Sequence, residues 1–218
     1  MLLRACLTAL LLIHGLGGSA ADQDVAATRS LTELLGRITT FTASFEQETT
    51  DTRGYVLETQ KGTMGLEKPG RFRWQIDSPF PQLVVARSGT VYLYDPDLEQ
   101  LTIQAVDDST GPNPALLLTE SNTQVLERFE ISRGRSQGSR QDFVLRPRDE
   151  EALFSQIRLT FANQELSEIA IVDHLEQITQ IAFENVVVNR VLESGYFEVE
   201  VPEGTDVIGD VPDRDSAG

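Results

Sequence analysis

The heptapeptide RFRWQID at residues 71–77 alternates strictly between polar and apolar side chains. Successive side chains on a β-strand point to opposite faces, so Phe72, Trp74 and Ile76 share one face of the predicted strand. The same period of two recurs in Phe41-Ala43-Phe45, Val91-Leu93, Phe143-Leu145 and Ile157-Leu159-Phe161. The pattern therefore predicts a series of short strands that each bury one face.

Turn-type residues separate these segments at intervals of roughly 8–12 residues, which is typical of an antiparallel meander. We expect strands at residues 41–46, 55–60, 62–66, 71–77, 83–87, 90–94, 100–106, 143–146, 157–161, 166–172, 178–188 and 196–201. The tail after Asp206 is acidic and rich in turn residues.

Helical patterns are fewer. Leu31, Leu34, Leu35 and Ile38 follow the spacing of one apolar helix stripe. Pro114 precedes the apolar run 115–118 and suits a helix start, whereas residues 122–130 fit either a helix or a strand. We predict a mainly β (α+β) fold with two or three helices packed on one side of a curled antiparallel sheet.

The first 21 residues, MLLRACLTALLLIHGLGGSAA, have the layout of a cleaved secretory signal: one basic residue, an apolar stretch and small residues. An uncleaved short anchor is the alternative. We expect residues 22–218 to form a single domain with an acidic C-terminal tail from about residue 207. That mature chain contains no cysteine, so its stability has to come from packing in an envelope or extracellular space.

The charge balance limits the possible partners. The chain has 18 Lys and Arg against 34 Asp and Glu, a net charge of −16, and loss of Arg4 with the signal makes it −17. Such a balance argues against nucleic acid and against a polybasic membrane-binding face.

Motifs for catalysis and metal binding are weak. Residues 134–138, GRSQG, match the pattern G-x-S-x-G, but no buried strand precedes and no helix follows them. We interpret them as a solvated hairpin turn, and an esterase built on Ser136 and His174 is the enzyme alternative. Residues 95–99, DPDLE, lack the glycine and the terminal glutamate of a calcium loop. The sequence thus favours a binding module without metal or cofactor over an enzyme.

The apolar strand face has two interpretations that periodicity does not separate. It is either an ordinary core or a hollow suited to aliphatic chains.

Residues 68–74, KPGRFRW, resemble the signature of the outer-membrane lipoprotein carrier family, the LolA-type periplasmic chaperones, which usually reads RPGRFRW. The resemblance extends in the same order to FTASFEQ at 41–47, GTVYLYDP at 89–96, PALLL at 114–118, DFVLRP at 142–147 and the segment from Phe197 to Val207.

The resemblance implies an incomplete barrel of about ten or eleven strands, closed by a helical lid over an apolar cavity. Such a carrier is a monomer without a cofactor. It accepts lipoproteins from an inner-membrane ABC transporter, shields their acyl chains across the periplasm and delivers them to an outer-membrane receptor. A related half-barrel module that binds lipid or glycolipid, or senses envelope state, is the alternative.

The resemblance also assigns roles to residues. Lys68 stands where the family has an arginine that holds the lid, although lysine lacks the planar fork of arginine. Arg71, Phe72 and Arg73 are expected to dock to the transporter or receptor, and Phe72→Glu is expected to disrupt loading without disturbing the fold. The expected lining of the acyl-chain cavity is Phe72, Trp74, Ile76, Val91, Leu93, Leu116, Leu117, Phe143 and Leu145.

Overall fold

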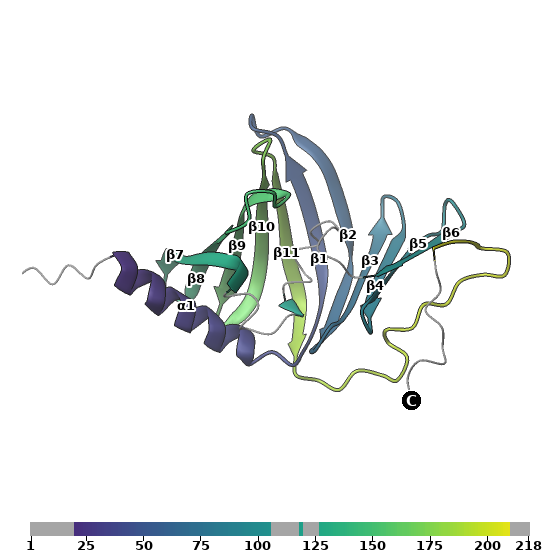
Figure 1. Cartoon of the computed structure of the whole chain (residues 1–218), viewed down its shortest axis with the longest axis horizontal. Coiled ribbons are helices and arrows are strands. Elements are labelled where there is room, and N and C mark those ends of the chain that lie inside the picture. Colours follow the sequence, from purple (N-terminus) through teal and green to yellow (C-terminus); the bar gives the residue numbers. More distant parts are fainter. Residues whose placement is uncertain (1–19, 106–117, 120–126, 210–218) are drawn as a thin grey trace, which may run out of the picture.

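The computed structural model describes residues 20–105, 118–119 and 127–209 (Figure 1). Within these ranges the chain forms one helix and one continuous sheet of twelve strands. The elements are α1 (Ala20–Gly36), β1 (Thr40–Thr50), β2 (Val56–Glu67), β3 (Arg71–Ser78), β4 (Gln82–Arg87), β5 (Thr90–Asp95), β6 (Gln100–Ala105), β7 (Phe129–Gln137), β8 (Arg140–Pro147), β9 (Phe154–Ala162), β10 (Glu165–Asp173), β11 (Ile178–Val188) and β12 (Asp206–Ile208).

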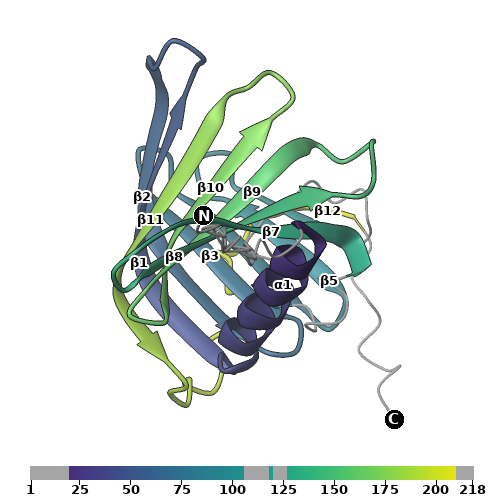
Figure 2. The same ribbon diagram turned by 90° about the vertical axis from the view of Figure 1, so that its left-hand side faces the viewer.

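The strand order is β12-β6-β5-β4-β3-β2-β1-β11-β10-β9-β8-β7. Neighbouring strands are antiparallel, except that β12 pairs with β6 in parallel. The sheet is strongly curled, and α1 lies across the inside of the curl next to β7 (Figures 1 and 2). We call the side of the sheet that α1 covers the inner face and the opposite side the outer face.

The inner face carries the main core. Phe41 on β1 is paired with Leu66 on β2, which is paired with Phe72 on β3, so the three side chains share this face. They form one buried cluster with the apolar stripe of α1, including Leu31 and Leu35. The sequence-predicted helix stripe is therefore confirmed, and its burial explains why this segment forms a helix.

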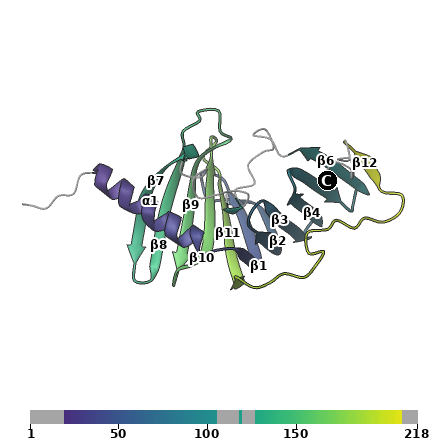
Figure 3. The ribbon, with the colours of Figure 1, turned by 60° about the horizontal axis from the view of Figure 1, so that its bottom comes forward.

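The outer face of β3–β6 carries a separate and smaller apolar group. Val85, Leu101 and Ile103 are buried although they lie outside the main cluster. Residues 189–205, which we call the C-terminal strap, run from the end of β11 along the sheet to β12 (Figure 3). Phe197 of the strap is also buried.

The mainly β, curled architecture is confirmed, but the strand and helix numbers differ from the prediction. The described ranges hold twelve strands rather than ten or eleven, and α1 is the one complete helix within them, with residues 127–128 also helical. Residues 55–66, predicted as two strands, fall largely in the single strand β2. The expected lid run at 115–118 lies outside the described residues, apart from the buried Leu118.

The remaining differences have local causes. Residues 122–126 of the ambiguous segment lie outside the described ranges, residues 127–128 are helical, and β7 begins at Phe129, where the apolar alternation is only two residues long, Phe129 and Ile131. Residues 196–201 form no strand, because the strap is held by turns and by side chains from β3. The three-residue β12 is too short to leave a sequence signal. No described helix is long and apolar enough to cross a membrane.

Candidate functional site: the apolar inner face

An aromatic stack forms the centre of the inner face. The rings of Phe45 on β1 and Trp74 on β3 stack with centroids 3.8 Å apart and planes at 21°, and Phe72 lies 6.2 Å from Trp74. Gly62 on β2, between these strands, leaves room for this contact, since a Cβ there would lie 2.9 Å from Phe45 Cζ. The geometry gives a wide aromatic surface, in which the indole nitrogen of Trp74 is the one polar side-chain atom of the three rings.

The register brings the predicted lining residues onto this one face. Trp74 on β3 is paired with Val84 on β4, which is paired with Leu93 on β5. Phe72 is likewise paired with Ala86, which is paired with Val91. Phe143 and Leu145 on β8 lie further along the same buried cluster. Six of the predicted residues are buried, Leu93 is half-buried, and Leu116 and Leu117 lie outside the described ranges.

The inner face is closed in this conformation. Phe72, Phe143 and Leu145 are 0% exposed, and Ile76 is also buried. α1 covers this face next to β7, and its stripe and Leu118 belong to the same buried cluster. A ligand can therefore reach these side chains only when a covering element moves away.

Lys68 connects the β2–β3 turn to the end of α1. Its Nζ donates a hydrogen bond to the carbonyl oxygen of Leu35 at 2.9 Å, and its backbone N donates to Thr39 O at 2.8 Å. The last turn of α1 has no basic residue of its own, so Lys68 supplies the positive charge that a helix C-terminus favours. Partial burial lowers the pKa of Lys68 below its ordinary value.

The same turn contacts the segment that precedes β7. Gly70, which follows a cis Lys68–Pro69 peptide bond, donates from its backbone N to Thr119 O at 3.4 Å. Leu118 and Thr119 are both buried. Residues 68–70 therefore contact two different covering segments, which is the position expected for a residue that controls closure.

The three predicted docking residues do not share a face. Phe72 is fully buried on the inner face, whereas Arg71 and Arg73 lie on the outer one, where Arg71 pairs with Glu67 at 3.5 Å. The expectation that Phe72→Glu leaves the fold intact is corrected by this burial, because an unpaired carboxylate would replace a core ring. Direct contact of Phe72 with a partner would require the inner face to open.

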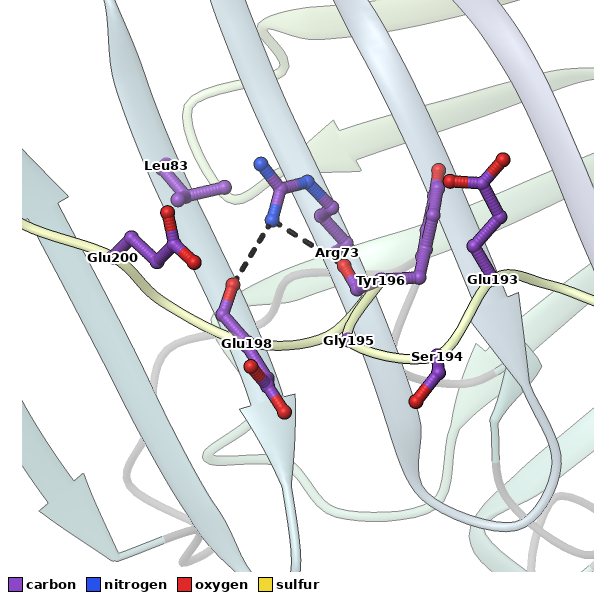
Figure 4. A pocket seen from close by; sticks show the side chains of 8 residues that line it. All are labelled: Arg73, Leu83, Glu193, Ser194, Gly195, Tyr196, Glu198 and Glu200. Atoms are coloured by element: carbon purple, nitrogen blue, oxygen red, sulfur yellow. Dashed lines mark hydrogen bonds between the residues drawn. The ribbon is translucent and has the colours of Figure 1, made fainter.

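Arg73 instead holds the C-terminal strap (Figure 4). Its Nη1 donates to the backbone carbonyl oxygens of Tyr196 and Glu198 at 3.4 and 3.3 Å, and its guanidinium lies 5.9 Å from the centre of the Tyr196 ring. A groove of about 460 Å³ opens beside these contacts, lined by Arg73, Leu83, Glu193, Ser194, Gly195, Tyr196, Glu198 and Glu200.

Tyr196 covers the outer face of β2. A Cβ on Gly65 would lie 2.4 Å from Tyr196 Cε1, so the ring packs directly on this glycine. Burial raises the pKa of the Tyr196 phenol, partly offset by the charge of Arg73. Sequence reasoning missed this contact; the available signal was a glycine at a polar-face position of a strand.

The residues of the esterase alternative do not meet. Ser136 is paired with Gln141 on β8, and Gln141 is paired with Phe161 near the end of β9. His174 follows Asp173, which is paired with Phe154 at the start of β9. Seven residues of β9 separate the two ends, roughly 23 Å. His174 Nε2 is within 2.6 Å of Ala152 O instead. Among the described residues, no three His, Cys, Asp or Glu side chains form a group that could hold a metal ion.

Known proteins match the chain over most of its length. The family model for the outer membrane lipoprotein carrier protein LolA matches residues 36–200. An outer-membrane lipoprotein carrier protein of Azotobacter vinelandii is 40% identical over 190 residues, 87% of this chain and 91% of the relative. One from Pseudomonas aeruginosa UCBPP-PA14 is 40% identical over 194 residues, 88% and 93% of the two chains.

A solved structure also shares the fold. The crystal structure of an uncharacterized conserved protein from Thermus thermophilus has a TM-score of 0.52 at 14% identity, covering 82% of this chain and 98% of the other. At that identity the likeness shows the architecture alone. With the match of the family model and the relatives at 40% identity, the chain belongs to the outer-membrane lipoprotein carrier family, LolA.

Proposed function

We propose that this protein is a periplasmic chaperone that carries lipoproteins from the inner to the outer membrane. The observation that carries the proposal is the closed apolar inner face in a chain of the LolA family. The protein accepts released lipoproteins, shields their acyl chains on this face and delivers them to an outer-membrane receptor. It acts by binding and release, without catalysis, metal or cofactor.

The energetics fit this task. Each CH₂ group moved out of water is worth roughly 0.8 kcal/mol, so an acyl chain needs a continuous apolar surface to cross an aqueous space. The inner face provides one from Trp74 on β3 to Phe143 on β8. Closure in the empty state keeps the same surface out of water, so the ligand competes with the protein's own covering segments.

The transfer partners are an inner-membrane ABC transporter that supplies the lipoprotein and a receptor at the outer membrane. Arg71 is more than half exposed and lies next to the strap-bound Arg73, so this part of the outer face is available to a docking protein. Phe72 joins such a contact only in the open state. The net charge of −17 after removal of the signal keeps the free carrier away from anionic lipid surfaces between the two encounters.

Lys68 controls closure in this proposal. Its bond to Leu35 O is a single point contact, where a guanidinium would offer several donors in one plane. Breaking it removes one of the bonds that hold α1 in its closed position, and so lowers the cost of exposing the inner face.

A release assay tests the function. Spheroplasts with labelled lipoproteins are incubated with residues 22–218, and the supernatant is examined for a soluble one-to-one complex. Wild type and the matched control Ser136→Ala should release lipoprotein equally, because Ser136 lies on the exposed end of β7. If a folded protein forms no complex although the transporter is active, the carrier function is wrong, and a sensing or glycolipid-binding module takes its place.

A further inference from the structure

The junction between α1 and β1 is bridged by one side chain from the far end of the sequence. Asn189 follows β11, and its Nδ2 donates to the carbonyl oxygen of Arg37 at 2.8 Å. Its Oδ1 accepts from both the backbone N and the Oγ1 of Thr39, at 2.8 and 2.9 Å. One amide thus binds the chain on both sides of Ile38, where the helix has ended and the strand has not begun.

Backbone groups of residues 189 and 190 also bind the start of β1. Asn189 N donates to Thr40 O at 2.9 Å, and Thr40 Oγ1 donates to the carbonyl oxygen of Arg190 at 2.7 Å. Asn189 has a φ of +59°, a conformation that asparagine tolerates better than other residues with a side chain. The backbone of Asn189 is therefore held by the start of β1 and by its place after β11, and not by α1.

The other polar contacts of α1 divide into two groups. Lys68 donates to Leu35 O and Arg37 donates to Gln164, so together with Asn189 these contacts act on residues 35–39. Arg133 on β7 binds Ser30 Oγ at 2.9 Å, further toward the N-terminal end of the helix. Side chains from three separate elements thus bind the chain where α1 ends, which makes residues 35–39 a suitable pivot for the helix.

We propose that Asn189 is a positioning residue that sets the angle at which α1 leaves β1, and that α1 turns about residues 37–39 when the inner face opens. This inference rests on the proposed function, because only a carrier needs that face to open. The amide keeps its bonds to Thr39 while the bond to Arg37 O, on the helix side, breaks. Opening then changes few bonds and leaves β1 in register with β11.

Two substitutions separate positioning from mere stability. Asn189→Gly keeps the backbone conformation and removes all three side-chain bonds. Asn189→Asp keeps the two acceptor contacts with Thr39 but loses the donor to Arg37 O. A structural role alone predicts lower stability with unchanged geometry of α1, whereas positioning predicts a graded change in the angle of α1.

The experiment measures the distance between α1 and the sheet. Residues 22–218 contain no cysteine, so spin labels at Glu33→Cys on α1 and Glu58→Cys on β2 report it without interference. Both positions are exposed. We expect one narrow distance distribution for the wild type, a broad one with an added longer population for Asn189→Gly, and an intermediate result for Asn189→Asp.

Trp74 gives a second, independent readout. It is the single tryptophan of the chain and is only 5% exposed, so acrylamide quenching reports opening of the inner face. The quenching constant should rise in the order wild type, Asn189→Asp, Asn189→Gly. Distance distributions identical to that of the wild type in both variants would overturn the proposal. If Asn189→Gly fails to fold, Asn189→Asp and Thr39→Val, which loses only the hydroxyl contact, decide between the two outcomes.

Neither measurement uses lipoprotein, so failure here is distinct from failure of the release assay. A carrier whose α1 stays fixed in all variants would retain the proposed function and lose this mechanism of opening.

Discussion

Both faces of β3–β6 bury apolar side chains, yet the two faces are closed in different ways. The inner face packs into one apolar cluster that also contains Leu118 and the stripe of α1, which lies next to β7 at the other end of the sheet. The outer face is covered by the C-terminal strap, which is fixed by hydrogen bonds and a ring contact from Arg73. Adjacent residues, Phe72 and Arg73, therefore serve opposite closures.

The difference between the two closures indicates which covering element can move. Apolar contacts between α1 and the sheet are non-directional, so the helix can be replaced by another apolar body such as an acyl chain. The strap contacts need specific geometry, in particular the packing of Tyr196 on Gly65, and are lost when the strap shifts. The inner face is thus suited to exchange and the outer face to permanent closure.

The largest effect should come from truncating the inner core. Phe72→Ala is expected to lower the free energy of unfolding by about 4 kcal/mol, because a fully buried ring leaves a cavity. Val85→Ala, its neighbour on the outer face, should cost about 2 kcal/mol. Urea denaturation followed by circular dichroism measures both. Equal costs would contradict the view that the inner cluster is the main core.

Gly62→Ala tests how tightly the inner face is packed, with an expected loss of about 3 kcal/mol in unfolding free energy. The added Cβ would lie 1.9 Å from the carbonyl oxygen of Gln75, a backbone atom that cannot move without disturbing β3. The shape of the Trp74 emission spectrum should change as well. A variant with wild-type stability and emission would show that the stack of Phe45 and Trp74 is not constrained as described.

Gly65→Ala, three residues along the same strand, makes the matching test of the outer face. Its Cβ meets the Tyr196 ring, a side chain that can yield, so we expect a loss of only about 1 kcal/mol. Hydrogen exchange should accelerate in residues 193–200 and not in α1. In the Tyr196→Ala background, Gly65→Ala should cause no further loss of unfolding free energy. Strictly additive losses from the two substitutions would argue against the contact between Tyr196 and Gly65.

The smallest effects are expected from pH, with opposite signs for the two closures. The pKa of Lys68 is lowered by burial, so its contribution to stability rises as pH approaches the unfolded-state value of 10.5. The pKa of Tyr196 is raised, so its contribution is lost as pH rises above the unfolded-state value of 10.0. Chemical denaturation between pH 8 and 11 measures how the free energy of unfolding changes with pH. Comparison with Lys68→Met and Tyr196→Phe isolates the contribution of each residue, and contributions that change with pH in the same direction would refute the opposite pKa shifts.

Much of the inner face was predictable from the sequence. Strict alternation in residues 71–77 places Phe72 and Trp74 on one face, and the spacing of Leu31 and Leu35 predicts the helix stripe that joins the same buried cluster. These signals depend only on local periodicity, which survives in a single sequence. The family motif at residues 68–74 added a role for Lys68, and the structure places its Nζ on the end of α1.

Neither the C-terminal strap on the outer face nor the α1–β1 junction could be predicted from local periodicity. Tyr196 and Phe197 look like a strand by composition, but Tyr196 packs on Gly65 of β2 and its carbonyl oxygen binds Arg73 of β3, about 120 residues earlier. Asn189 resembles any polar residue after a strand, and its importance depends on bonds across 150 residues of sequence. Long-range pairing by single side chains leaves no periodic pattern.

The central claim is that acyl chains bind the inner face and not the outer one, and β4 offers a matched pair to test it. Val84 packs against the inner cluster, while its neighbour Leu83 lines the outer groove. A photo-cross-linking residue is placed at either position, and the protein is loaded with labelled lipoprotein from spheroplasts. The account predicts a lipoprotein adduct from position 84 and none from position 83. An adduct from position 83 alone, or equal adducts from both, would contradict it.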